Sequence, residues 1–296
     1  MESRESTKPI AFYKMSGSGN DFVIIDNREG VVADEQLPGF IAKVCLRRMS
    51  IGADGLILIE RSESVDFRWR FFNSDGSVAE MCGNGARCVA RFAVLNGIAP
   101  ADLSFETDVG VIEAHVRGDM VKIKMSDPKD LVMNDGIVLA NYPVPISRVN
   151  TGVPHVVMEV KDLPSANVKG VGREIRFHDQ FAPEGTNVNF IAPLNDTMWA
   201  IRTYERGVEG ETLACGTGNV SAALVLAERY QFPSPVTLKT LSGSDLTIYF
   251  KKVDDRYTDV YLEGDARVIY RAEMDPEAWQ FELGQPDSPP SSPQAD

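Results

Sequence analysis

One short pattern occurs twice in this sequence and limits what the chain can fold into. At 81–88 the sequence reads MCGNGARC, and at 214–220 it reads ACGTGNV. In both places a cysteine stands directly before Gly-x-Gly, and an apolar run with helical spacing follows. The two cysteines, Cys82 and Cys215, lie 133 residues apart, each near the middle of its half of the chain. This repeat indicates an internal duplication on the scale of a domain.

The elements expected around the two copies are also similar. Short strand-like segments precede and follow a helix at 86–97, and the same order recurs around a helix at 219–230. A further helix is expected within 36–48. The polar, turn-rich segment 126–136 is the candidate boundary between the two halves. The acidic, Pro/Ser-rich end, 283–296, is expected to be a disordered tail.

Composition excludes several classes of protein. The chain has 296 residues, which is enough for two domains, and its net charge of −13 argues against a nucleic-acid binder. It has no apolar stretch long enough for a membrane span and no secretory leader at its start, so no membrane partner is expected. Four cysteines without a C-x-x-C pair favour a reducing, cytoplasmic setting over a disulfide scaffold or a structural zinc site.

A cysteine at the start of a helix has distinctive chemistry. The first backbone N–H groups of a helix have no partner within it, and the helix carries a partial positive charge there. The pKa of such a thiol is therefore expected to fall below its free value of about 8.5. The same N–H groups can hold a carboxylate, and the glycines allow the ligand to approach the backbone closely. One such helix start supplies a base and a carboxylate site together.

Two such helix starts suggest a reaction. If the halves pack face to face, two thiols flank one carbon, and one removes a proton while the other delivers a proton to the opposite face. This predicts a two-cysteine racemase or epimerase without pyridoxal phosphate, another cofactor or a metal, because the N–H groups stabilise the carbanion. A lone Cys-Gly-x-Gly is more often structural, and a Cys82–Cys215 disulfide would be an oxidation product. Cys45 and Cys88 are interpreted as packing residues.

A set of motifs in sequence order resembles diaminopimelate epimerase. These motifs are MSGSGNDFVIID, FFNSDGSVAEMCGNGARC, NTGVPHVV, TNVNF and YERGVEGETLACGTG. The resemblance runs from about residue 12 to residue 271 and implies conversion of LL-2,6-diaminopimelate to the meso form, for lysine and bacterial peptidoglycan precursors. It implies an α+β fold of two pseudo-symmetric domains, each with strands wrapped around a central helix, and an active site between them. The domains would be 1–130 with a returning strand near 267–275, and 131–266.

The resemblance also implies roles for individual residues. Cys82 and Cys215 match the catalytic cysteines, and His155 and Glu205 match polar residues that set the protonation of the thiols. The backbone donors for the reacting carboxylate would be Gly83, Asn84, Gly216 and Thr217. The far end of the substrate would be bound by Asn20, Asn73, Asn187, Glu205 and Arg206. From the residues alone, His155 also fits a core histidine and Asn73 fits turn chemistry.

Two positions depart from the family pattern, and two rival functions stay open. Some members have asparagine where this chain has Val153, and glutamine where it has Gly55. A related racemase acting on proline or hydroxyproline would use the same two cysteines but would not need the distal asparagines and Arg206. A non-catalytic anion-binding protein is the other rival, although the glycine pattern does not fit a phosphate loop. The partner expected is a small molecule, and the oligomeric state is left open, with a homodimer among the options.

Overall fold

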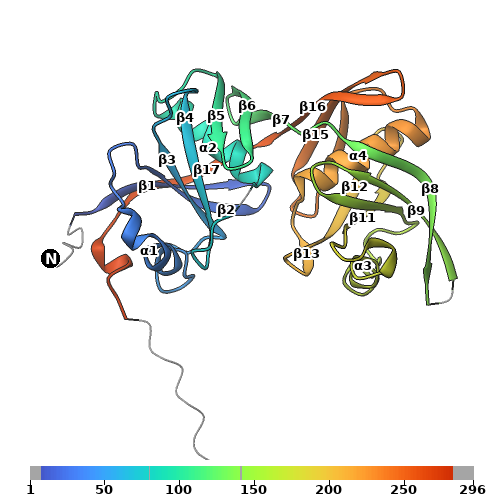
Figure 1. Ribbon diagram of the computed structural model, residues 1–296, viewed down its shortest axis with the longest axis horizontal. Helices are drawn as coiled ribbons and strands as arrows, with labels where there is room; N and C mark the ends of the chain where they lie inside the picture. The colour runs from blue at the N-terminus through green and yellow to red at the C-terminus, as the bar shows by residue number, and fades with distance from the viewer. Residues whose placement is uncertain (1–7, 80, 141, 283–296) are drawn as a thin grey trace, which may run out of the picture.

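The structure is a computed structural model that describes residues 8–79, 81–140 and 142–282. Figure 1 shows two lobes side by side, one around helix α2 (Gly83–Leu95) and one around helix α4 (Gly216–Tyr230). The expected tail at 283–296 lies outside the described residues. Among the residues that are described, no helix is both long enough and apolar enough to cross a bilayer.

The lobe of α2 is built mainly from short strands. They are β1 (Ile10–Gly17), β2 (Asn20–Asp26), β3 (Gly55–Glu60), β4 (Phe67–Asn73), β5 (Asp102–Thr107), β6 (Gly110–Arg117) and β7 (Met120–Lys124). Its other helices are the 3-10 helix η1 (Asp34–Gln36) and α1 (Leu37–Val44). Helix α1 is shorter than the segment expected at 36–48, and Cys45 follows its last residue as a buried side chain.

The lobe of α4 has the same character. Its strands are β8 (Lys129–Leu139), β9 (Tyr142–Asn150), β10 (Pro154–Glu159), β11 (Asn187–Pro193), β12 (Trp199–Glu205), β13 (Gly210–Thr212), β14 (Val236–Lys239), β15 (Asp245–Val253) and β16 (Arg256–Asp265). Its remaining helices are α3 (Val168–Arg176) and the 3-10 helix η2 (Asp179–Phe181). The chain then continues as β17 (Arg267–Met274) and the 3-10 helix η3 (Pro276–Ala278).

The expectation of a turn-rich segment at 126–136 is wrong in one respect, because most of it belongs to strand β8. Two of its polar residues, Asp130 and Asn134, adopt positive φ angles of 55° and 54°, which depart from regular strand geometry. Asn and Asp tolerate this left-handed conformation better than most residues. The pairing of β8 with β9 shifts register in the same region, so the strand is irregular but continuous.

The two central helices are enclosed by strands on every side. Every residue from 84 to 90 in α2 is buried, and so is every residue from 218 to 226 in α4. A helix buried over such a run has no solvent face. Helix α2 contacts β1, β2, β3, β6 and β7, whereas α4 contacts β8 to β12, β14 and β15, and both helices contact β16. The α+β architecture with one wrapped helix in each lobe is thus present.

Strand pairing joins the two lobes. Strand β16 pairs antiparallel with β15 in its own lobe and with β7 of the other, from Tyr261 opposite Lys124 to Asp265 opposite Met120. The chain then crosses over, and β17 pairs antiparallel with β1. In Figure 1 this last strand leaves the lobe of α4 and lies beside β1. One apolar cluster runs through both lobes, so their cores are continuous.

Candidate active site

The two cysteines of the repeat occupy the same local structure. Cys82 is the N-cap residue of α2, with φ −142° and ψ 117°, and Cys215 is the N-cap residue of α4, with φ −118° and ψ 115°. Both are extended residues at which a strand-like segment enters a helix. Both are free thiols, Cys82 half-buried and Cys215 buried. The predicted placement of a thiol at each helix start is confirmed.

The two helix starts lie against each other. The side-chain amide of Asn84 in α2 donates to the carbonyl of Ala214, the residue before Cys215, at 3.4 Å. Leu262 of β16 packs against both helices, since a Cβ atom at Gly83 would lie 3.5 Å from its methyl group and one at Gly216 would lie 3.0 Å from it. Both thiols therefore belong to one site at the junction of the lobes.

The pKa values of the thiols differ from the expectation. Burial raises the pKa of Cys82, and it raises the pKa of Cys215 to about 12. The helix starts act in the expected direction, because backbone N–H groups of Gly85 and Gly218 oppose the rise, but desolvation is the larger effect. The prediction of lowered pKa values is wrong for this reason. Both thiols are therefore protonated at neutral pH.

Glu205 adds to this effect. It is the last residue of β12 and is half-buried, and burial raises the pKa of its carboxyl group. Its negative charge in turn raises the pKa of both Cys82 and Cys215. The position expected for a group that influences the protonation of the thiols is therefore occupied by a carboxyl close enough to act on both.

His155 is a buried, neutral imidazole on β10. Burial, together with the positive charge of Arg206, lowers its pKa to about 3. Its Nδ1 atom lies 3.1 Å from the amide nitrogen of Asn189, which also donates to the carbonyl of Val156 at 2.9 Å. Because Nδ1 accepts this hydrogen bond, the ring proton is assigned to Nε2. Among the described residues this buried Nε2 has no hydrogen-bond partner, so a donor is available for a ligand.

Asn20 connects the Cys82 side of the site to the first lobe. The thiol of Cys82 donates to its side-chain oxygen at 3.4 Å, and its side-chain nitrogen donates to Asp54 at 2.7 Å. Asp54 forms an ion pair with Arg47 at 2.9 Å. The sequence pattern identified Asn20 but not Asp54 or Arg47. It did single out Gly55, the residue directly after Asp54.

The residues expected at the far end of the substrate fall into two groups. Asn187 is buried, its oxygen accepts from the backbone N–H of Arg206 at 2.9 Å, and its nitrogen donates to Pro154 at 3.1 Å. Its amide thus orients Arg206 and the residue before His155. Asn73 is exposed at the end of β4 and donates to Ser77 at 3.0 Å within its own turn, as the turn interpretation expects.

The start of α4 carries a second polar contact to a thiol. The hydroxyl of Thr217 lies 3.4 Å from the sulfur of Cys215. The first N–H groups of both helices, at Gly83 and Asn84 and at Gly216 and Thr217, have no acceptor within their own helix. Unpartnered N–H groups at a helix start are suited in general to hold a carboxylate.

Of the two positions that depart from the family pattern, Gly55 has a local explanation and the side chain of Val153 has none. Gly55 begins β3, where a Cβ atom would lie 2.6 Å from the carbonyl oxygen of Phe72 in β4. A larger residue there would require the two strands to separate. The carbonyl of Val153 accepts a backbone hydrogen bond from Thr151 at 3.2 Å, which shapes the turn before His155.

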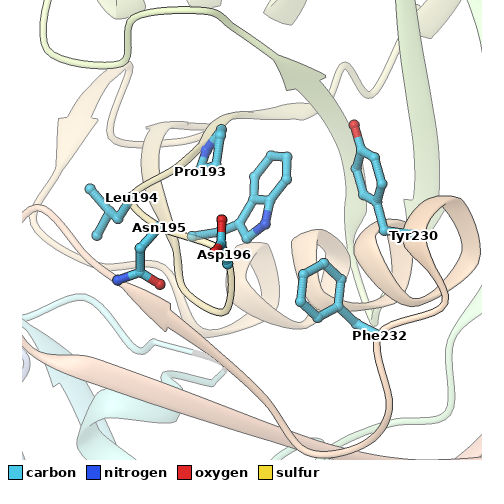
Figure 2. Close-up of a pocket in the computed structure, with 7 residues that line it drawn as sticks. Pro193, Leu194, Asn195, Asp196, Tyr230 and Phe232 are labelled. Atoms are coloured by element: carbon cyan, nitrogen blue, oxygen red, sulfur yellow. The ribbon is translucent and has the colours of Figure 1, made fainter.

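A hollow at the C-terminal end of α4 lies away from this site. Figure 2 shows Tyr230 and Phe232 bordering it together with residues of the loop after β11, and these two residues lie at and just beyond the C-terminal end of α4. At a rise of about 1.5 Å per residue, α4 separates this end from Cys215 by roughly 20 Å. The hollow is therefore not part of the thiol site. A second cavity, of about 180 Å³, is bordered by His155, Pro154 and Thr186, and neither thiol is among the residues that line it.

Comparison with known proteins places this arrangement in a family. The family model described as diaminopimelate epimerase matches residues 12–131 and 147–269. The diaminopimelate epimerase of Aquifex aeolicus is 43% identical over 92% of this chain and 100% of its own length. That of Hydrogenobaculum sp. is 49% identical over 87% of this chain and 95% of its own length.

Solved structures with low sequence identity share the fold. A PhzF-family phenazine biosynthesis protein of Bacillus anthracis matches with a TM-score of 0.70 at 17% identity, over 90% of this chain and 99% of its own. A hydroxyproline epimerase of Agrobacterium vitis matches with a TM-score of 0.66 at 15% identity, over 93% and 96%. With the sequence matches over most of the chain, these findings lead to one assignment. The chain belongs to the diaminopimelate epimerase family.

Proposed function

We propose that Cys82 and Cys215 are the acid and the base with which this chain performs the reaction of its family. The chain is a diaminopimelate epimerase, an isomerase of lysine biosynthesis that converts LL-diaminopimelate to the meso form. The observation that supports the two roles is the meeting of two thiol-capped helix starts, joined through Asn84 and Ala214. An acid and a base on opposite faces of one carbon suit inversion better than a single group.

The reaction needs one thiolate and one thiol. The thiolate takes the α-proton, so that a C–H bond breaks and an S–H bond forms, and the thiol on the other face gives its proton to the same carbon. The charge that develops at the carbon is delocalised into the attached carboxylate. We assign the stabilisation of this charge to the N–H groups at the two helix starts, those of Gly83, Asn84, Gly216 and Thr217.

Glu205 is the group we assign to the formation of the thiolate. Both thiols have raised pKa values, and the Glu205 charge contributes to both. When a proton moves from a thiol to Glu205, whose own pKa is raised by burial, the charge that opposes the thiolate is removed. The free energy of this proton transfer is therefore lower than implied by the difference between the pKa values that the thiol and the carboxyl group have when each titrates separately. Closure around the substrate would strengthen these interactions by excluding water.

We assign the choice of substrate to the residues that bind the end of the ligand far from the reacting carbon. Arg206 is half-buried, and its backbone is held by the side chain of the buried Asn187. A guanidinium can bind a second carboxylate in a bidentate way. Diaminopimelate carries such a group and proline does not, so a buried polar site left unpaired would reject proline.

A substrate panel in deuterated water tests this function. We expect exchange of the α-proton and epimerisation with LL- and meso-diaminopimelate, and rates at least about 10²-fold lower with proline and 4-hydroxyproline, because a site built for a polar group strongly rejects ligands that lack it. The measurement follows deuterium incorporation by NMR and stereochemistry by chiral chromatography. Turnover of proline without turnover of diaminopimelate would overturn the assignment.

The donor role of His155 makes a separate prediction. The amide nitrogen of glutamine can take the place of Nε2, whereas asparagine reaches only the place of Nδ1. We therefore expect His155→Asn to lower kcat/KM by about 10- to 100-fold, the value of a hydrogen bond to a charged group, and His155→Gln to retain more of it. Steady-state kinetics on both variants provide the measurement. An Asn variant as active as the Gln variant, or more active, would contradict a donor at Nε2.

A further inference from the structure

One buried charge near the thiols has no role in the mechanism above. Arg87 lies one turn into α2, and its side chain is fully buried, with 0% exposure. Among the described residues, no carboxylate lies within ion-pair distance of its guanidinium, although 18 ion pairs occur elsewhere in that part of the chain. A buried cation without an anionic partner is costly. Arginine nevertheless stays charged in proteins, so this charge calls for an explanation.

The hydrogen-bond partners of the guanidinium are neutral groups, although the carboxylate of Asp265 lies close enough for its charge to act on Arg87. It donates to the hydroxyl of Ser18 at 2.9 Å, to the side-chain oxygen of Asn84 at 3.0 Å, and to the carbonyls of Asp265 and Gly83 at 3.3 and 3.4 Å. The backbone packs closely beside it, since a Cβ atom at Gly264 would lie 3.2 Å from its Nε atom. The side chain is thus fixed in place from several sides.

The partners of Arg87 belong to the segments that form the active site. Ser18 lies in the turn between β1 and β2, two residues before Asn20, which accepts from the Cys82 thiol. Asn84 receives one hydrogen bond from Arg87 and gives another to Ala214, next to Cys215. Asp265 ends β16, where the chain crosses from one lobe to the other. A single guanidinium therefore contacts the Cys82 side and the crossover directly, and it is linked to the Cys215 side through Asn84.

We propose that Arg87 is a positioning residue of the epimerase site, which fixes Asn84 between the two helix starts and supplies the positive charge that favours a thiolate at Cys82. This inference rests on the proposed roles of the two thiols. Its charge acts in the required direction, since Arg87 lowers the pKa of Cys82 against the effect of burial. The Asp265 carboxylate acts on Arg87 only from beyond ion-pair distance, and the thiolate, or the substrate carboxylate held at the helix starts, adds a further counter-charge during turnover.

Arg91 provides a matched control from the same helix. It lies one turn further along α2, and its guanidinium donates to the carbonyl of Ala266, the residue after the Asp265 carbonyl that Arg87 contacts. Loss of Arg91 therefore removes an arginine from the crossover without removing the contacts to Ser18 and Asn84. An effect on the thiols that is specific to Arg87 separates its role from general destabilisation.

The test is the pH dependence of alkylation of Cys82 by iodoacetamide, followed by peptide mass spectrometry. In Arg87→Met the side chain stays unbranched and apolar near the backbone but loses the guanidinium and its charge, so the pKa of Cys82 should rise and alkylation at pH 8 should slow by a few-fold. Arg91→Met should alkylate as the wild type does. An unchanged profile in Arg87→Met, or the same change in Arg91→Met, would overturn the inference.

Arg87→Lys tests the positioning part and covers the case in which the methionine variant does not fold. Lysine keeps the charge but lacks the planar fork that reaches Ser18 and Asn84 together. We expect alkylation of Cys82 close to the wild-type profile and a kcat for epimerisation about tenfold lower, because misplaced groups slow catalysis. Wild-type kcat in this variant would refute the positioning role. The alkylation readout needs no turnover, so it stands apart from a failure of the wild type to epimerise diaminopimelate.

Discussion

Replacement of Cys82 or of Cys215 by alanine is expected to lower kcat/KM for epimerisation by about 10²- to 10⁴-fold, the usual contribution of a positioned acid or base. Each variant keeps the helix start and its N–H groups, so the substrate carboxylate should still bind. Steady-state kinetics, with calorimetric titration of diaminopimelate, separate the two effects. We expect the dissociation constant to change by only a few-fold.

The other two cysteines supply matched controls. Cys45 and Cys88 are buried in the apolar cores, and burial raises the pKa of each thiol to about 12. Cys88→Ala and Cys45→Ala remove a sulfur from packing and should cost about 1 kcal/mol of stability without a large change in kcat/KM. If Cys215→Ala retained near-normal turnover, or if Cys88→Ala lost it, the assignment of the acid–base pair would be wrong.

Much of the local structure was predictable because its causes are local. The repeated Cys-Gly-x-Gly before an apolar helical run predicted both helix starts, and Cys82 and Cys215 are the N-cap residues of α2 and α4. The helix expected at 86–97 also ends close to the observed end, since Asn96 is the C-cap residue of α2 and Gly97 has φ 64°. These features depend on residues within a few positions of one another.

The electrostatics of the thiols were not predictable from the same pattern. A helix start lowers the pKa of a thiol, but burial opposes it, and burial of Cys215 depends on how two lobes pack. The partners of the site were missed for a related reason. Asn189 was quoted within a motif, but its contacts to His155 and Thr203 span 34 and 14 residues of sequence. Only the fold brings such groups together.

The two copies of the repeat also differ in a way that their sequences hide. Gly85 and Gly218 hold the same place, the second glycine of each Cys-Gly-x-Gly. A Cβ atom at Gly218 would lie 2.3 Å from the side-chain oxygen of Asn189, whereas one at Gly85 would lie 3.2 Å from a methyl group of Ile57. Asn189 is fully buried, with hydrogen bonds to His155, Val156 and Thr203, so it has little freedom to move. The methyl group of Ile57 can shift more easily.

Gly218→Ala is therefore expected to cost about 1 to 3 kcal/mol of unfolding free energy, the range for overpacking a core. It should also lower kcat/KM by up to about 10²-fold, because displacement of Asn189 moves His155. Alanine favours a helix by up to about 1 kcal/mol over glycine, which offsets the milder contact at Gly85 and makes Gly85→Ala close to neutral in stability. Urea unfolding and steady-state kinetics on the pair provide the measurement. Equal losses of stability and of kcat/KM in the two variants would contradict this expectation. They would mean that Asn189 does not constrain Gly218, and that the hydrogen bonds holding His155 tolerate the added methyl group.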